Sequence, residues 1–132
     1  MLGNYQSFFM KRLNRWFGPD TAPLGLNDRF AGFLGDSQAG MERHGYRRGC
    51  LIGALGQETA GLDNDFRVEL ERALTEWDAV LARCLARSGI QGDCMTLANA
   101  FWASWEGAVL RAMLSRDAES LRLAVKRFLA SL

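Results

Sequence analysis

Apolar residues recur along the chain at intervals of three and four residues, with polar residues between them, over nearly its whole length. This spacing places the apolar side chains on one face of an α-helix. The strict alternation of apolar and polar residues that marks a half-buried strand never extends beyond a few residues. The pattern therefore predicts an all-α fold, an antiparallel bundle of about six helices.

The ends of these helices are marked by residues that stop or cap a helix. Proline lacks an N–H group and restricts the residue before it, so Gly18-Pro19 ends the first helix. Asp63, Asp93 and Asp117 each precede an apolar-periodic segment and can cap its free backbone N–H groups. We therefore expect helices over residues 2–17, 27–43, 50–60, 63–87 and 93–116, and a last one from residue 117 onward.

The segment 93–116 differs from the others because it is apolar nearly all round. A helix of this kind is buried on more than one side. In a chain of 132 residues, one of the covering surfaces is expected to be another subunit, so a homodimer is predicted. Asn99, Glu106 and Arg111 interrupt the apolar run, which argues against a membrane span.

Composition narrows the class of protein. With 48% hydrophobic and 23% charged residues, residues 1–132 are expected to form one globular domain. The formal net charge of +1, without a basic segment, argues against a DNA-binding surface. The three cysteines show no CxxC spacing and the N-terminus is too polar for a signal peptide, so a cytoplasmic protein without disulfides or a zinc site is expected.

The sequence carries no recognisable catalytic constellation. His44 is the only histidine, and one histidine cannot build a His-rich metal site or fill several catalytic roles. The nucleophile-elbow, P-loop and dinucleotide-binding patterns are also absent from the sequence. We therefore expect a protein that is not an enzyme and that needs no cofactor or metal.

Aromatic residues point to a binding cavity between the helices expected at 27–43, 50–60, 63–87 and 93–116. Aromatic residues at helical spacing often form plain core, but four tryptophans exceed ordinary packing needs and ligand cavities are typically aromatic. Gln57 and Glu58 are polar residues on an otherwise apolar expected helix. Buried polar groups need partners, which a ligand or a neighbouring backbone would supply. The candidate ligand-binding residues are Phe30, Phe33, Ala54, Gln57, Glu58, Trp77, Phe101, Trp102 and Trp105.

Cys50 is a candidate redox or electrophile sensor. It follows Arg47 and Arg48 at the start of an expected helix, and both cations and a helix N-terminus can lower the pKa of a thiol. The alternative is that Cys50 is a small buried apolar residue. Cys84 and Cys94 fall on apolar helix faces and are interpreted as packing residues.

Three successive segments resemble the ligand-sensing domain of TetR/AcrR-type bacterial transcriptional regulators. The stretch Arg47–Glu58, with the sequence RRGCLIGALGQE, resembles the start of a central helix of that domain. A long charged helix at 63–87 follows, and then the apolar helix at 93–116 that carries the sequence WEGA. The resemblance covers nearly the whole chain, but the sequence leaves no room for an N-terminal helix-turn-helix. An isolated effector-binding and dimerisation domain is therefore expected.

This resemblance implies a function. A small-molecule effector would bind inside the bundle, and the helices at 63–87 and 93–116 would pair with those of a second copy in a four-helix interface. DNA would be bound only through an N-terminal domain that this chain lacks. The expected interface residues are Leu74, Leu81, Trp105, Gly107, Ala108 and Arg111. Two other classes stay open: a stand-alone helical protein–protein interaction module, and a small-molecule binder or enzyme without recognisable catalytic residues.

Overall fold

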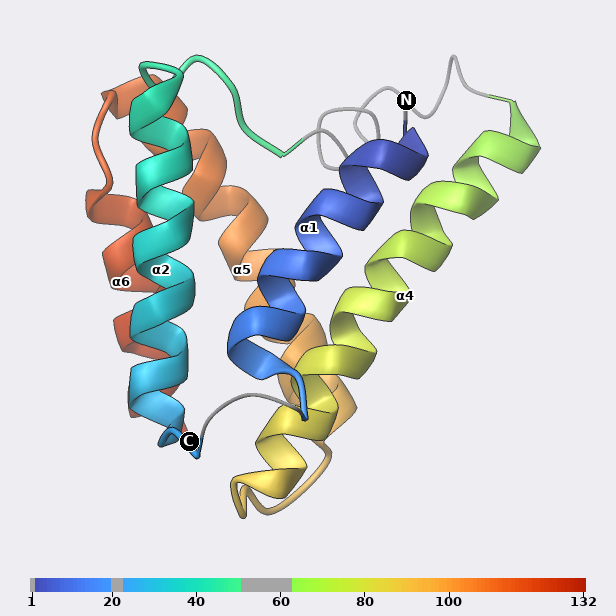
Figure 1. Ribbon diagram of the computed structural model, residues 1–132, viewed down its shortest axis with the longest axis vertical. Coiled ribbons are helices and arrows are strands. Elements are labelled where there is room, and N and C mark those ends of the chain that lie inside the picture. The colour runs from blue at the N-terminus through green and yellow to red at the C-terminus, as the bar shows by residue number, and fades with distance from the viewer. Residues whose placement is uncertain (1, 20–22, 51–62) are drawn as a thin grey trace.

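The computed structural model describes residues 2–19, 23–50 and 63–132. These residues contain five helices and no strand: α1 Leu2–Phe17, α2 Leu26–Arg43, α4 Asn64–Arg87, α5 Cys94–Ser115 and α6 Glu119–Ala130 (Figure 1). The all-α class is thus confirmed, with five helices in the described residues where about six were expected. The helix expected at 50–60 lies outside the described residues except for Cys50, which has irregular backbone.

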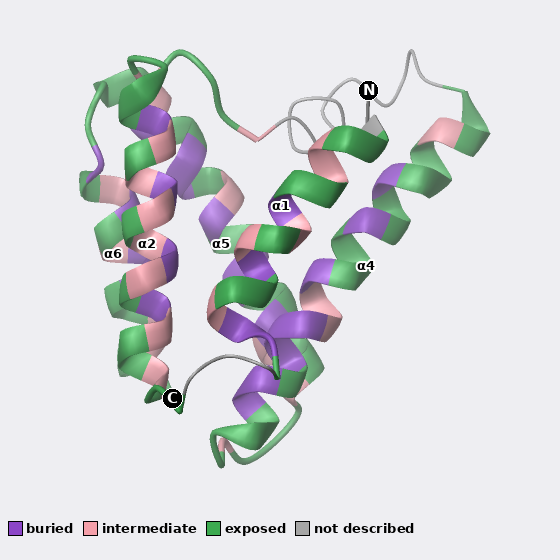
Figure 2. Cartoon of the chain, viewed as in Figure 1, coloured by how far each residue is buried: buried purple, intermediate pink, exposed green. Residues whose placement is uncertain are grey.

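Helix α5 is the centre of the bundle. It packs against α4 on one side and α6 on the other, while α1 packs against α4 and α2, and α2 against α6 (Figure 1). Its buried residues recur at intervals of three and four and form one stripe, while the opposite face of the helix is exposed in this chain (Figure 2). The burial on more than one side that the apolar sequence predicts is therefore not seen within the chain itself. None of the helices that the structure describes has the length and apolar character needed to cross a membrane.

The core is a cluster of aromatic rings contributed by several helices. Trp77 and Trp102 meet with ring centroids 5.7 Å apart, and Phe33 lies 5.0 Å from Trp105. Aromatic pairs in such tilted and edge-on arrangements contribute about 0.5–1.5 kcal/mol each beyond their buried area. The fully buried large side chains are Leu13, Phe17, Phe30, Phe33, Trp77, Leu81, Leu85, Phe101 and Leu121.

Helix capping follows the sequence prediction at two helices and departs from it at a third. The Asp63 carboxylate accepts a hydrogen bond from the Phe66 N–H at 2.8 Å, and Asp93 accepts one from the Thr96 N–H at 3.2 Å. The N-cap of α6 is Ala118 instead of the expected Asp117.

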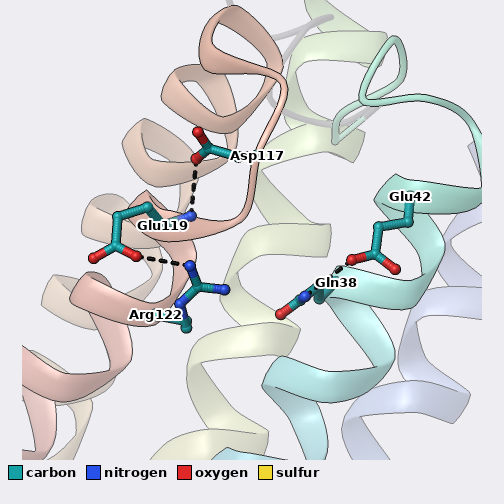
Figure 3. Close-up of polar contacts among 5 residues, drawn as sticks. All are labelled: Gln38, Glu42, Asp117, Glu119 and Arg122. Atoms are coloured by element: carbon teal, nitrogen blue, oxygen red, sulfur yellow. Dashed lines mark hydrogen bonds and ion pairs between the residues drawn. The ribbon is translucent and has the colours of Figure 1, made fainter.

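Asp117 still accepts a hydrogen bond at the start of α6, from the Glu119 N–H at 3.1 Å (Figure 3). The same turn holds an ion pair of 2.7 Å between Glu119 and Arg122. The first turn of α6 is therefore stabilised by side chains on either side of the cap residue. A separate hydrogen bond lies on the facing α2, where Gln38 donates to Glu42 at 2.9 Å (Figure 3).

A tight corner after α2 returns the chain toward α5. Gly45 and Tyr46 have φ angles of 60° and 58°, in the left-handed region that costs a non-glycine residue energy. Arg116, at the α5–α6 corner, donates to the Gly45 and Tyr46 carbonyl oxygens at 3.2 and 3.0 Å. The corner is thus held by the neighbouring α5–α6 corner at the same end of the bundle, and residues 47–50 then cross from α2 toward α1 (Figure 1).

Glycines allow two close approaches in this part of the fold. A methyl group on Gly32 would overlap the indole ring of Trp16, so α1 and α2 pack closely only because Gly32 lacks a side chain. A methyl group on Gly49 would lie 2.5 Å from Met113 Sδ and 3.0 Å from Val109 Cγ1. Gly49 therefore lets residues 47–50 lie directly on α5.

Candidate functional site

A cavity of about 650 Å³ lies between α1, α2, α5 and residues 47–50. Small-molecule sites commonly enclose about 300–1,000 Å³. The lining residues are Tyr5, Phe8, Phe9 and Arg12 of α1, Ser37, Gly40, Met41 and Arg43 of α2, His44 and residues 47–50, and Trp105, Glu106, Val109, Leu110 and Met113 of α5. The size of the cavity suits a ligand, and the close contact of Gly49 with Val109 and Met113 forms part of its wall.

Most of the cavity wall is apolar. Phe9, Met41, Trp105 and Val109 line it and are each at least nine-tenths buried, which fixes their positions in the surrounding core. Phe8, in contrast, is 60% exposed and stands at the edge of the cavity. Apolar walls with a few polar groups are the usual composition of a small-molecule site.

Two polar groups lie buried in this apolar surface. Ser37 is 5% exposed, and its Oγ has no hydrogen-bond partner within the described residues. Glu106 Oε1 is likewise buried without a partner in that part of the chain. Burial costs a polar atom about 1–3 kcal/mol when it has no partner. The two atoms are therefore available to hydrogen-bond a molecule that enters the cavity.

The Glu106 carboxyl group is electrostatically unusual. Burial raises its pKa, and a side-chain hydrogen bond with Cys50 opposes this increase. The neutral acid is therefore favoured relative to an ordinary glutamate, and a neutral carboxyl group can donate as well as accept a hydrogen bond. Cys50 reaches Glu106 because Gly49 lets residues 47–50 lie on α5.

Arginines surround the opening of the cavity. Arg12 and Arg43 come together at Gly40, where a methyl group would lie 3.3 Å from Arg12 Nη2 and 4.0 Å from Arg43 Nη2. Burial lowers the pKa of Arg12, Asp36 and Tyr5 oppose this, and Arg43 lowers it further. Arg47 and Arg48 add two exposed cations to the lining. The described lining residues therefore carry an excess of positive charge.

Most of the aromatic residues that were predicted to bind a ligand do not line this cavity. Trp105 lines the cavity. The other nominated aromatic residues are buried in the core and are not among the described lining residues: Phe30, Phe33, Trp77, Phe101 and Trp102. Ala54, Gln57 and Glu58 lie outside the described residues.

The structure explains why the core tryptophans differ from Trp105. Trp102 Nε1 donates to the Trp77 carbonyl oxygen at 3.1 Å, and Trp77 Nε1 donates to Gln6 Oε1 at 3.1 Å. Their rings also pack on one another. These side chains satisfy both their apolar and polar groups within the protein, which fits a core role.

The cavity includes residues that the sequence interpretation did not nominate. Ser37 lies on the inward stripe of α2 together with Phe30, Phe33 and Met41, and a serine on such a buried stripe is a recognisable signal for a polar site. Arg12 lies on α1 and was not assigned a binding role from the sequence. Its position opposite Gly40 depends on how α1 and α2 pack, which the sequence of α1 alone does not specify.

The cysteines differ in their surroundings. Cys50 lines the cavity beside Glu106, while Cys84 is 1% exposed and burial raises its pKa. Cys94 is partly buried at the start of α5. The helix expected to acidify Cys50 lies outside the described residues, so its sensing role stays a prediction.

The expected interface residues divide into two groups. Leu81, Trp105 and Ala108 are buried within the chain itself, at 0%, 3% and 7% exposure. Leu74, Gly107 and Arg111 are exposed. Leu114, which was not predicted as an interface residue, is the most exposed large apolar side chain of the described residues, at 76%. The outer face of α5 thus combines small and apolar residues with Arg111, and Gly107 lies in open space.

Comparison with known proteins identifies relatives among transcriptional regulators. Residues 28–127 match the family described as transcriptional regulator LmrA/YxaF-like, C-terminal domain, of TetR type. The chain is 37% identical to transcriptional regulator AcuR of Cereibacter sphaeroides over 131 residues, which cover 94% of this chain and 58% of AcuR. It is 32% identical to the HTH-type transcriptional repressor DhaR of Mycobacterium sp. strain GP1 over 80 residues, which cover 56% of this chain and 40% of DhaR.

A solved structure shows the same fold. The crystal structure of regulatory protein TetR from Rhodobacter sphaeroides superposes with a TM-score of 0.87 at 35% identity, covering 96% of this chain and 69% of that one. In the sequence comparisons, the chain spans little more than half the length of AcuR and less than half that of DhaR. These relatives are regulators and not enzymes, in agreement with the sequence prediction.

Proposed function

Because this chain belongs to the TetR family of transcriptional regulators, as an LmrA/YxaF-like C-terminal domain, we propose that it is a sensor whose cavity binds a small-molecule effector. The observation that carries the proposal is the cavity of about 650 Å³, with Ser37 Oγ and Glu106 Oε1 buried beside it without partners in the described residues. Bound effector would supply the hydrogen bonds that the protein does not.

The position of the cavity offers a route from binding to regulation. Its walls come from α1, α2 and α5, so an effector contacts three helices at once. A ligand shifts a conformational equilibrium only when it binds one arrangement more tightly than another. An effector that favours one spacing of α1 relative to α5 would move the N-terminal end of α1. In a longer protein, that end would lead toward a DNA-binding segment.

Filling the cavity tests the proposal. Ser37→Leu and Val109→Phe place extra atoms in the cavity, and compounds that raise the melting temperature of the chain should lose this effect in both variants. A ligand present at 100 times its Kd stabilises the folded state by about 2.7 kcal/mol. The exposed change Arg83→Gln on α4 is the control. Compounds that stabilise the filled variants as strongly as the parent chain would place the binding site elsewhere.

We also propose that the chain forms a homodimer through the outer face of α5. The exposed residues Ala100, Ala103, Gly107, Arg111 and Leu114 recur at intervals of three and four and form one stripe, in which all members except Arg111 are small or apolar. Small residues let two helices approach closely, and an obligate interface commonly buries about 2,000 Å² or more in total. We therefore propose the exposed stripe of α5 as the interface, and not the buried residues Leu81, Trp105 and Ala108.

Sedimentation measures this association. Gly107→Leu adds bulk where the structure leaves open space and replaces a poor helix former, so the monomer should be at least as stable as before while the dimer dissociates at least ten-fold more readily. Gly35→Leu, also in open space but on α2, is the matched control. A parent chain that sediments as a monomer at micromolar concentration would refute the homodimer. A stoichiometric complex with a different protein would favour an interaction module instead.

A further inference from the structure

We infer that the effector is an organic anion with an apolar body, whose charged group is held by Arg12 and Arg43 beside Gly40. This inference rests on the proposed function and specifies the chemistry of the ligand. Its apolar body would lie against Trp105, Val109 and Met113, which form the α5 wall.

The first argument is the convergence of two like charges. Arg12 Nη2 and Arg43 Nη2 lie 3.3 and 4.0 Å from one point, the position of a methyl group on Gly40. Two guanidinium groups so close repel each other, and Arg43 accordingly lowers the pKa of Arg12. A carboxylate, sulfonate or phosphate group between them would convert this repulsion into two charge-assisted hydrogen bonds.

The second argument is that the described chain does not neutralise these arginines by direct pairing. Its ion pairs are Arg15–Asp36, Arg67–Glu71 and Arg122–Glu119, and none includes a cavity arginine. Asp36 is the nearest source of opposite charge for Arg12, but its carboxylate already accepts from Arg15 at 3.0 Å and from Trp16 Nε1 at 2.8 Å. The nearby carboxylate is thus already hydrogen-bonded to Arg15 and Trp16, one helical turn along α1 from Arg12.

The third argument concerns the one acid in the lining. Glu106 is the only acidic residue among the described lining residues, and burial favours its neutral form. Four arginines, Arg12, Arg43, Arg47 and Arg48, face the same cavity. An excess of positive charge around an apolar cavity selects a ligand that is both anionic and apolar. Ser37 and neutral Glu106 would then hydrogen-bond a second polar group along its body.

A matched pair of fluorescent probes tests this preference. 1-Anilinonaphthalene-8-sulfonate and N-phenyl-1-naphthylamine share one ring system and differ by a sulfonate group. If the arginines hold an anion, the chain binds the sulfonate probe at least about ten-fold more tightly, even though the neutral probe is the more hydrophobic of the two. Octanoate should also displace the bound sulfonate probe at concentrations at which octanol does not.

Single arginine changes identify the source of the preference. Arg43→Gln should weaken binding of the sulfonate probe about five-fold and leave the neutral probe unchanged, and Arg12→Gln should act in the same direction. Arg83→Gln removes one exposed helix cation on α4, away from the cavity lining, and is the control for net charge. It should leave the affinities for both probes unchanged.

The possible failures are distinguishable. If neither probe binds, both the proposed function and the anion preference are overturned. Equal binding of the two probes, lost in Ser37→Leu, would keep the cavity as a binding site and overturn the anion preference. If Arg83→Gln weakens the sulfonate probe as much as Arg43→Gln does, the preference comes from overall charge, and the assignment of Arg12 and Arg43 is wrong.

Discussion

Helix α5 contributes to two regions that differ in the hydrogen bonding of their buried polar groups. Toward α4, the indole N–H groups of Trp102 and Trp77 are both hydrogen-bonded within the protein, at 3.1 Å each. Toward α1 and α2, Ser37 Oγ and Glu106 Oε1 are buried without partners in the described chain. Both regions are apolar and aromatic, so composition alone does not separate them.

This difference distinguishes a region that stabilises the fold from a region that is suited to bind a ligand. A polar group satisfied inside the core contributes to the free energy of unfolding, whereas one left without a partner lowers it by about 1–3 kcal/mol. Proteins keep such local costs mainly where function requires them. The α4 side of α5 is therefore interpreted as the stabilising half of the domain, and the α1–α2 side as the binding half.

The largest expected effect on the free energy of unfolding comes from removing a buried side chain on the α4 side of α5. Trp102→Ala removes a 3% exposed side chain and its hydrogen bond to Trp77, and should lower the free energy of unfolding by about 3–5 kcal/mol. Phe8→Ala, at a position 60% exposed at the edge of the cavity, should change it by less than about 0.5 kcal/mol. Urea denaturation measures both, and similar losses would remove the distinction between the two halves.

Glycine substitutions in α2 should have opposite signs. Gly32→Ala forces a methyl group into the ring of Trp16 and should cost about 1–3 kcal/mol. Gly35→Ala meets nothing within 4 Å and should stabilise the helix by about 0.5–1 kcal/mol. Thermal unfolding of the two variants provides the comparison. A stabilising Gly32→Ala change would show that the close packing of Trp16 on α2 is not required.

The buried acid should make stability depend on pH. Below the pKa of an unfolded glutamate, about 4.3, both states hold the Glu106 proton and the group adds no pH dependence. Above it the unfolded chain releases the proton first, because burial raises the folded pKa. The free energy of unfolding should therefore fall as the pH rises toward the folded pKa.

Glu106→Gln removes this titration. The variant should gain stability relative to the parent chain between about pH 4 and pH 7, as measured by urea midpoints at each pH. The exposed change Glu69→Gln on α4 is the control and should show no such trend. A parent chain that becomes more stable than Glu106→Gln as the pH rises would mean that Glu106 is ionised and paired in the folded state.

The smallest expected effect is a difference in cysteine labelling. Cys50 lines the cavity and should react with iodoacetamide faster than Cys84, which is 1% exposed and whose pKa is raised by burial. A ligand that fills the cavity should slow the labelling of Cys50 alone. Mass spectrometry of the alkylated peptides measures each rate. Equal rates, unaffected by ligand, would leave Cys50 as a packing residue.

The helices were predictable from the sequence because their signals are local. Apolar spacing, Gly18-Pro19, and the caps at Asp63 and Asp93 placed the helix ends within a residue or two. The family was also predictable, since the RRGC stretch and the WEGA-bearing helix occur in order along the chain. Asp117 was placed one residue from the true cap because Asp117 and Ala118 both precede the helix.

The cavity was harder to predict because it depends on contacts between distant segments. Trp77 and Trp105 look alike in sequence, and only packing shows that Trp77 is satisfied in the core while Trp105 lines the cavity. Arg12 and Arg43 are separated by thirty-odd residues and meet only because α1 packs against α2 at Gly40. The inward serine at position 37 was the one local signal of a polar site.

Methionine methyl groups offer the most direct test of the central claim, that the cavity is the ligand site. Met41 and Met113 line it, whereas Met10 and Met95 are not among its lining residues. In a chain with carbon-13-labelled methionine methyl groups, titration with 1-anilinonaphthalene-8-sulfonate should shift the Met41 and Met113 resonances and leave those of Met10 and Met95 in place. Shifts at Met95 with none at Met41 or Met113 would contradict the account.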